Sequence, residues 1–208
     1  MATSKPVIRV ELHSDQDSES PRHWDNLGVM VCAHRCYSLG DDDGARKALD
    51  LVRECFSSDQ LDAMGFDPEH IPDLEALLEK SGKAIILPLY LYDHGGITMK
   101  TTPFSCRWDS GQVGFIFVSK EKVRREYDWK RINSARTSQI HKLLEGEVEV
   151  YDQYLRGDVW GFKVFKDDEE ADSCWGFYGD NPLSNGVIDH LCVQAKALVA
   201  AGDFQRIY

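Results

Sequence analysis

The sequence lacks any apolar stretch long enough to cross a membrane. Its longest uncharged apolar run, residues 84–92, has nine positions, whereas a membrane helix needs about 20. The first six residues show no apolar stretch behind a basic start, and neither end carries a lipidation pattern. We therefore expect no secretory signal and no membrane association, and we predict a protein that stays in the cytoplasm.

Short motifs of common enzymes are also missing. The chain contains no G-x-S-x-G, Walker A, H-E-x-x-H or G-x-G-x-x-G pattern and no C-x-x-C pair. Its cysteines are scattered through apolar patterns, which predicts reduced and mostly buried thiols. They are Cys32, Cys36, Cys55, Cys106, Cys174 and Cys192. We predict no cofactor and no metal.

One cysteine cluster needs a separate argument, because Cys32, His34 and Cys36 alternate along the chain. If this stretch is a strand, all three side chains lie on one face. Zinc binding normally uses a fourth ligand and a different spacing. The alternative, which we favour, is two core thiols beside a hydrogen-bonded histidine.

Basic residues are in the minority. Twenty-four Lys and Arg stand against 35 Asp and Glu, a net charge of −11, which argues against a nucleic-acid binder that neutralises phosphates. Residues 119–142 nevertheless carry eight basic residues against three acids, and residues 145–180 carry eleven acids against three basic residues. This asymmetry could orient a protein partner or could simply solvate helix faces.

The length and composition predict one folded domain. The 208 residues are 42% hydrophobic and 28% charged, as in an ordinary globular protein. We expect a single α+β domain over residues 1–208, with a polar loop at residues 14–22, because strand and helix patterns segregate rather than alternate. The predicted helices have apolar stripes at 3.6-residue spacing. They cover residues 45–56, 72–82, 119–127, 134–157 and 182–202.

The strand patterns predict an antiparallel sheet packed against these helices. Residues 83–92, 97–102 and 112–118 read as three consecutive strands, the first of them central in its sheet. Joined by short connections they would form a meander. Residues 6–13 and 29–37 are two further predicted strands.

A repeated triplet, Trp160-Gly161-Phe162 and Trp175-Gly176-Phe177, predicts a β-hairpin with a defined register. In this register the numbers of two paired residues add up to 337, so that Trp160 faces Phe177 and Phe162 faces Trp175. All four aromatic side chains then share one face of the hairpin, and both glycines share the other. The aromatic face could stack on a flat ligand or belong to the core. Opposed glycines suggest close approach of a helix or a ligand.

Asp93, His94, Asp109 and Ser110 invite a Ser-His-Asp interpretation, since a nucleophile needs a base and the base an orienting acid. The meander argues against it. It would place the two turns at opposite ends of one strand, roughly 20 Å apart at about 3.3 Å per residue. On the long helix, a stripe of Glu145, Glu149 and Asp152 could hold a metal or a basic partner, or form a solvated face.

Several segments resemble those of small uncharacterised proteins encoded by bacteriophages and prophages. The segments are Trp24-Asp25-Asn26-Leu27-Gly28, Leu89-Tyr90-Leu91-Tyr92-Asp93-His94, Trp108-Asp109-Ser110-Gly111-Gln112-Val113-Gly114-Phe115, Tyr151-Asp152-Gln153-Tyr154-Leu155 and Asp172-Ser173-Cys174-Trp175-Gly176-Phe177-Tyr178-Gly179. The resemblance covers residues 24–179 and carries no assigned chemistry. It implies a protein made in the cytoplasm of an infected bacterium.

These observations lead to one main functional hypothesis and two others. We expect an acidic phage-type accessory protein that binds a host or anti-phage defence protein, with oppositely charged regions and turn aromatics at the interface. The expected binding residues are Trp24, Asp25, Trp108, Gln112, Trp160 and Trp175. The alternative is a hydrolase or transferase for a nucleotide-like substrate, using Asp93, His94, Asp109 and Ser110. A structural virion protein is the third.

Overall fold

The computed structural model of the protein describes residues 6–208 and has an α+β fold, which confirms the predicted class. The expectation of no signal at the start of the chain falls on residues 1–5, which lie outside the described part. The strands are β1 (Ile8–Ser14), β2 (Val29–Cys32), β3 (Ala84–Asp93), β4 (Ile97–Lys100), β5 (Ser110–Ser119), β6 (Val159–Lys166), β7 (Glu169–Tyr178) and β8 (Gln205–Ile207). The α-helices are α1 (Gly44–Cys55), α2 (Ser58–Ala63), α3 (Ile71–Ser81), α4 (Lys120–Tyr127), α5 (Ser134–Leu155), α6 (Val187–His190) and α7 (Val193–Ala200).

The chain divides into two compact units, each built around its own four-stranded sheet. Unit 1 comprises residues 1–21 and 153–208, and unit 2 comprises residues 22–152. The single domain expected from the chain length stays a prediction, which separate expression of unit 2 can test. In residues 6–208 no helix is long and apolar enough to span a lipid bilayer.

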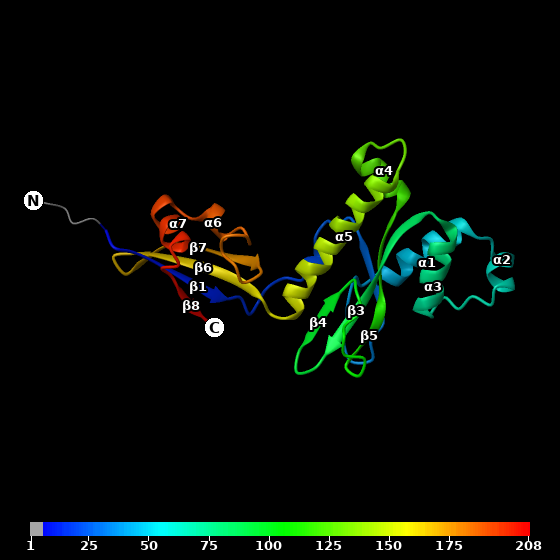
Figure 1. Ribbon diagram of the computed structural model, residues 1–208, viewed down its shortest axis with the longest axis horizontal. Coiled ribbons are helices and arrows are strands. Elements are labelled where there is room, and N and C mark those ends of the chain that lie inside the picture. Colours follow the sequence, from blue (N-terminus) through cyan, green and yellow to red (C-terminus); the bar gives the residue numbers. More distant parts are fainter. Residues whose placement is uncertain (1–5) are drawn as a thin grey trace, which may run out of the picture. The chain divides into compact units, whose positions relative to one another are not determined.

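Unit 1 is a sheet in the order β7-β6-β1-β8, covered on one face by α6 and α7 (Figure 1). β1 pairs antiparallel with β6 and parallel with β8. Inward side chains of β1, β6 and β7 meet those of the two helices in one apolar core. Its largest members are Leu12, Trp160, Phe162, Phe177 and Leu191. The predicted helix over residues 182–202 is in fact two short helices, since the backbone is extended at Leu191 and Cys192.

Unit 2 is a sheet in the order β2-β5-β3-β4 with helices on both faces (Figure 1). Phe115 and Phe117 of β5 pack with α1 and α3. The alternate residue Ile116 points to the other face, where Leu144 of α5 lies against Gly28 and Ile116. Both faces of β5 are therefore buried, which explains its uninterrupted apolar run. The predicted central position of β3 is confirmed.

The three strands β3, β4 and β5 do not form the predicted meander. β4 pairs with one edge of β3, and β5 pairs with the other edge, from Ala84↔Ser119 to Tyr92↔Ser110. β4 has only four residues, and residues 101–109 bring the chain back to the end of β3, where Asp93 N bonds to Asp109 O and β5 begins. Local sequence pattern does not decide between these two strand orders, because β5 is apolar enough to be buried in either.

The Trp-Gly-Phe hairpin forms, but its register shifts within the ladder. Trp160 faces Phe177 as predicted, whereas Phe162 faces Cys174 instead of Trp175. The shift is a β-bulge, in which Gly176 has a φ of 83° that favours glycine. One inserted residue moves Trp175 to the opposite face from the other three aromatics. The prediction that all four share a face is therefore wrong, and so is the prediction of opposed glycines.

Candidate functional site

The two turns that the meander would have separated lie side by side. Because β5 begins next to the end of β3, Asp93 N donates a 2.8 Å hydrogen bond to Asp109 O. His94 Nδ1 lies 3.4 Å from Asp109 Oδ2. The expected separation of roughly 20 Å is thus wrong, and its cause is the strand order. Carboxylate and imidazole can form a charge-assisted pair at this distance.

A thiol and a hydroxyl complete this group. Cys106 Sγ donates to Asp109 Oδ2 at 3.5 Å, and Ser110 Oγ donates to the carbonyl oxygen of Cys106. In residues 6–208 no hydrogen bond joins Ser110 to His94. The hydroxyl is directed at its own loop rather than at the base, so the structure does not assemble a Ser-His-Asp triad.

Asp93, Asp109 and Ser110 line an open cleft of about 550 Å³, which we call the Trp108 cleft. It is lined by strand ends and loops of unit 2, including His34, Arg35, Asp93, Trp108, Asp109 and Gln112. The cleft therefore brings together five of the candidate site residues selected from the sequence, namely Asp93, Trp108, Asp109, Ser110 and Gln112. His94 is at its margin and 70% of its side chain is exposed.

The second carboxylate of the cleft, Asp93, is paired with a tyrosine. A hydrogen bond to Asp93 is the main cause of the raised pKa of Tyr37, with burial and the Asp93 charge adding to it. The ring of Tyr37 stacks on His34 at a centroid distance of 4.9 Å. His34 and Asp93, which both line the cleft, thus each contact Tyr37.

Trp108 and Gln112 have very different environments. Trp108 is 95% exposed. Gln112 Nε2 donates to Glu75 Oε2 at 2.8 Å, which ties β5 to α3. Burial is the main cause of the raised pKa of Glu75, followed by repulsion from Glu79, while Gln112 opposes both. Of these two side chains, only that of Trp108 exposes a large apolar surface that does not pack against the rest of the protein.

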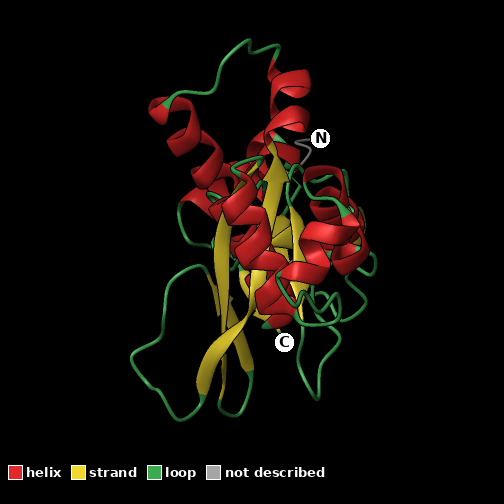
Figure 2. Cartoon of the chain, turned by 90° about the vertical axis from the view of Figure 1, so that its right-hand side faces the viewer, coloured by secondary structure: helices red, strands yellow, loops and turns green. Residues whose placement is uncertain are grey.

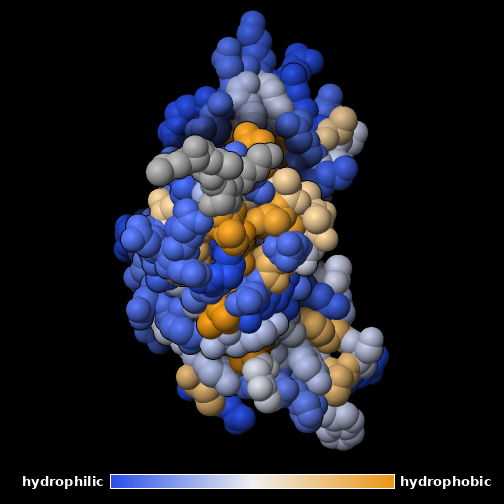
Figure 3. All heavy atoms as spheres, turned by 90° about the vertical axis from the view of Figure 1, so that its left-hand side faces the viewer, coloured by the Kyte–Doolittle hydropathy of each residue, from blue (hydrophilic) through white to orange (hydrophobic). Residues whose placement is uncertain are grey.

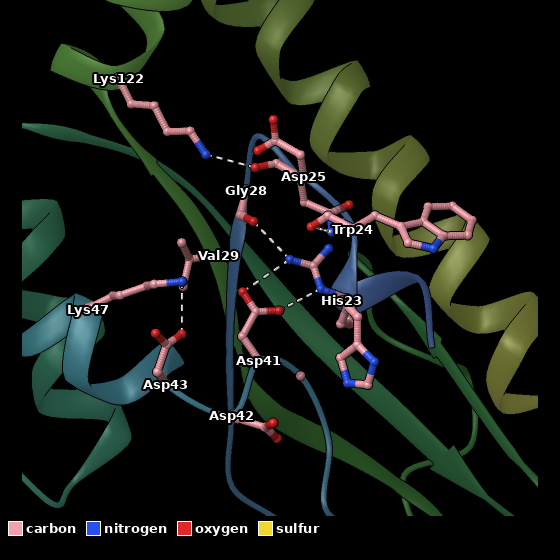
Figure 4. Close-up of a pocket in the computed structure, with 13 residues that line it drawn as sticks. His23, Trp24, Asp25, Gly28, Val29, Asp41, Asp42, Asp43, Lys47 and Lys122 are labelled. Atoms are coloured by element: carbon pink, nitrogen blue, oxygen red, sulfur yellow. Dashed lines mark hydrogen bonds and ion pairs between the residues drawn. The ribbon is translucent and has the colours of Figure 1, made fainter. Parts of the chain in front are cut away.

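Trp24 and Asp25 lie elsewhere in unit 2, in a pocket of about 450 Å³ (Figure 4). We call it the Asp41 pocket. Two lysines close its sides through short contacts, Lys47 with Asp43 Oδ1 at 2.8 Å and Lys122 with the carbonyl oxygen of Asn26 at 2.7 Å. Trp24 is 47% exposed. His94, Asp109 and Trp24 thus do not line one pocket.

The floor of the Asp41 pocket is a buried ion-pair network that the sequence analysis missed. Arg22 Nε donates to Asp41 Oδ1 at 2.6 Å, and a second nitrogen, Nη1, lies 3.2 Å from Glu147 Oε2. Glu147 also accepts from the backbone N–H of Leu27 at 2.8 Å. Burial disfavours the charged guanidinium, but the carboxylates outweigh it and raise the pKa of Arg22. The network joins the segment before β2 to the loop that precedes α1 and to α5.

The two hairpin tryptophans have separate roles. Trp160 is buried in the core of unit 1, and its indole N–H donates to Asp158 Oδ1 at 2.8 Å, so the expectation that it contributes to a binding surface is wrong. Trp175 is 43% exposed on the face without helices, 5.9 Å from the ring of His13. The close approach expected at the glycines is made by this indole over Gly161.

The candidate metal ligands are dispersed. β2 ends at Cys32, so Cys32, His34 and Cys36 do not share a strand face. Burial is the main cause that raises the pKa of Cys32 to about 12, which keeps the thiol protonated. On α5, Asp152 accepts from Thr98 Oγ1 at 2.6 Å and from Met99 N at 2.7 Å, and thereby fixes β4. In residues 6–208 no cluster of His, Cys, Asp and Glu side chains could hold a metal ion.

Unit 1 has a hollow of its own. It measures about 640 Å³ and lies among β1, β6, β7 and the residues that begin α7. Ile8, Val164 and Cys192 are among its lining residues. Figure 3 shows one face of the protein, on which apolar side chains gather among hydrophilic ones. The hollow contains one acid and one lysine, Asp172 and Lys166, and no arrangement that could carry out acid–base chemistry.

The chemical capacity of the Trp108 cleft follows from these contacts. It offers a large exposed indole for apolar contact, two carboxylates that attract cations, and a histidine-carboxylate pair that can move a proton. Comparison with protein-family models, with curated proteins and with solved structures finds no match to this chain.

Proposed function

We propose that this protein is a phage-type accessory protein that acts by binding another protein through the Trp108 cleft. The observation that carries the proposal is the exposure of Trp108, 95% of whose surface faces solvent beside a cleft. Tryptophan is among the residues that contribute most to protein interfaces, where losing one costs about 2 kcal/mol or more. A side chain that is so exposed contributes little to the stability of the fold, and its apolar surface is therefore available for contact with a partner.

The charges of the cleft favour a basic group on that partner. Asp93 at the end of β3 and Asp109 directly before β5 both line the cleft, and the side chain of Asp109 is 37% exposed. A lysine or arginine of the partner could approach these carboxylates while its aliphatic part packs on the indole of Trp108. Arg35, which also lines the cleft, would limit how many cations enter.

The resemblance to phage and prophage proteins supports the biological setting of the proposal. A small protein produced in the cytoplasm of an infected bacterium meets host proteins and anti-phage defence proteins. We therefore propose that the partner belongs to one of these two classes. The net charge of −11 favours a protein partner over nucleic acid.

A second candidate function is favoured by the His94–Asp109 pair. With Nδ1 of His94 facing Asp109 at 3.4 Å, Nε2 is the nitrogen that could accept a proton from a substrate or a water. A hydrolase or transferase acting on a nucleotide-like substrate could use this base, with Trp108 stacking on the base ring. The hydroxyl of Ser110 is not held by His94, so such an enzyme would activate water or a substrate hydroxyl.

The test is recovery of tagged protein from phage-infected bacteria, with companions identified by mass spectrometry. We expect a stoichiometric host or defence protein with the wild type and at least tenfold less of it with Trp108→Ala. Trp24→Ala is the matched control, because it removes the same side chain from a second exposed position, and it should retain the partner.

Two results would contradict the binding proposal. One is recovery of the protein without a stoichiometric companion, and the other is equal recovery of the companion with Trp108→Ala. The enzyme alternative is tested separately, by incubating wild type and His94→Ala with a panel of nucleotides. Turnover by the wild type that His94→Ala abolishes would establish it.

A further inference from the structure

We propose that a second surface of unit 2, the basic loop (residues 124–136), binds an acidic segment of a partner protein. The loop joins the end of α4 to the beginning of α5 and projects beyond both helices (Figures 1 and 2). It lies at the other end of β5 from the Trp108 cleft, since Ser110 begins β5 at the cleft and Ser119 ends it at α4. Ten strand residues separate the two surfaces by about 30 Å. The inference therefore goes beyond the proposed function and does not depend on it.

Aromatic and polar contacts hold the loop in one conformation. The rings of Tyr127 and Trp129 stack at 4.7 Å, and the guanidinium of Arg136 lies 4.6 Å from the centre of the Trp129 ring. Arg136 Nη1 also donates to the carbonyl oxygen of Arg131 at 2.5 Å. Asp128 ends α4 with a φ of 51°, and its N–H bonds to Arg124 O. A loop fixed in this way loses little entropy when a partner binds.

Four cations of the loop are exposed, namely Arg124, Arg125, Lys130 and Arg131. In residues 6–208 none of the four forms an ion pair, whereas Arg46 and Lys47 of α1 are both paired with Asp43. These four cations repel one another, and together with Arg136 they outnumber the two acids of the loop, Glu126 and Asp128, in a protein whose net charge is −11. Binding of an anionic segment would relieve that repulsion.

The contacts favour an acidic peptide over nucleic acid. Single-stranded nucleic acids bind by stacking their bases on open aromatic rings as well as by phosphate contacts. In the basic loop Trp129 contacts Tyr127 and Arg136, so its ring is already engaged. The basic side chains of the loop remain accessible. A run of glutamates or aspartates supplies the complementary negative charge and does not require a surface for stacking.

The experiment is fluorescence anisotropy on the full-length protein at low salt, with two labelled probes of equal length, a ten-glutamate peptide and a ten-nucleotide oligothymidine. The test variant is Arg125→Glu/Lys130→Glu/Arg131→Glu. The control variant, Arg53→Glu/Lys80→Glu/Lys166→Glu, makes the same charge change at exposed positions outside the loop. Circular dichroism melting of each variant checks that it is folded.

We expect the wild type and the control variant to bind the glutamate peptide, with an affinity that falls as salt is added. The test variant should bind at least tenfold more weakly. Tighter binding of oligothymidine than of the peptide, through the same residues, would overturn the proposal in favour of nucleic acid. Absence of peptide binding by the wild type, or an equal loss in the control variant, would overturn it altogether. Because Trp108 is not altered, failure here leaves the proposed function intact.

Discussion

The indole of Trp175 lies directly on the backbone of Gly161, so that a Cβ at position 161 would come within 2.2 Å of Trp175 Cε3. Gly161 is therefore required by its neighbour and not by its own backbone angles. The relationship exists because the bulge at Gly176 places Trp175 on the outer face of the sheet.

Gly161→Ala should destabilise unit 1 by about 1–3 kcal/mol, the cost of overpacking a closely fitted contact. In a Trp175→Ala background the same substitution should cost less than about 0.5 kcal/mol, because the obstructing ring is gone. Urea denaturation of the four members of this double-mutant cycle measures the coupling. Equal costs in both backgrounds would show that the ring is not what excludes a side chain.

Arg22→Met should cost about 3 kcal/mol of unfolding free energy, because it removes the buried cation of two carboxylates, Asp41 and Glu147, whose side chains are only 11% and 16% exposed. The control is Arg46→Met. Arg46 is 65% exposed in its pair with Asp43, and its loss should cost about 0–1 kcal/mol. Chemical denaturation followed by tryptophan fluorescence compares the two. Similar small effects for both variants would contradict a stabilising role for Arg22.

Stability should fall with rising pH between about 9 and 12 because of Cys32. Burial is the main cause that raises the pKa of this thiol from 9.0 to about 12, with repulsion from Asp41 adding to it and Arg22 opposing it. In that window the unfolded chain releases the proton while the folded protein retains it, so unfolding becomes easier as pH rises. Below pH 9 both states are protonated and the contribution is constant.

The measurement is the urea midpoint at several pH values from 8 upward, for wild type and Cys32→Ala. The stability of the variant should fall less steeply with rising pH than that of the wild type. The part of the pH dependence that comes from other titrating groups should remain. One such group is Tyr178, whose pKa burial and nearby acids raise to about 12. Parallel slopes for the two proteins would rule Cys32 out as the cause.

Residues 22–152 expressed alone should fold. This unit is continuous in sequence, and the apolar cluster between its sheet and helices α1 and α3 lies entirely within it. We expect dispersed amide signals in a two-dimensional NMR spectrum and a cooperative thermal transition. An unfolded fragment would favour the single domain that the chain length predicts.

Much of the secondary structure could be predicted because its signals are local. Pro72 in the first turn and Gly82 at the end mark α3, and Gly82 has the left-handed φ of 62° expected of a helix C-terminus. The apolar spacing of residues 140–155 likewise marked α5. Each of these signals lies within a few residues of the helix that it marks, so it can be recognised without knowledge of the tertiary structure.

Strand order and register could not be predicted in the same way. Whether β5 pairs with β4 or β3 depends on the route taken by residues 101–109, which carry no regular pattern. Asp109 and His94 were identified as candidates, but the distance between them followed from the assumed order and was wrong. Arg22 was missed because one arginine in a polar segment gives no sign that it will be buried between Asp41 and Glu147, the second of which lies 125 residues away.

The pairing of β1 with β6 and β8 also has a consequence for biosynthesis. Ile8 pairs with Lys166, so the first strand must wait until the ribosome has made most of the chain. At about 5–20 residues per second this delay is on the order of 10 seconds or more. Unit 2 can finish folding during that interval, and the nascent N-terminal strand stays available to chaperones until its neighbours emerge.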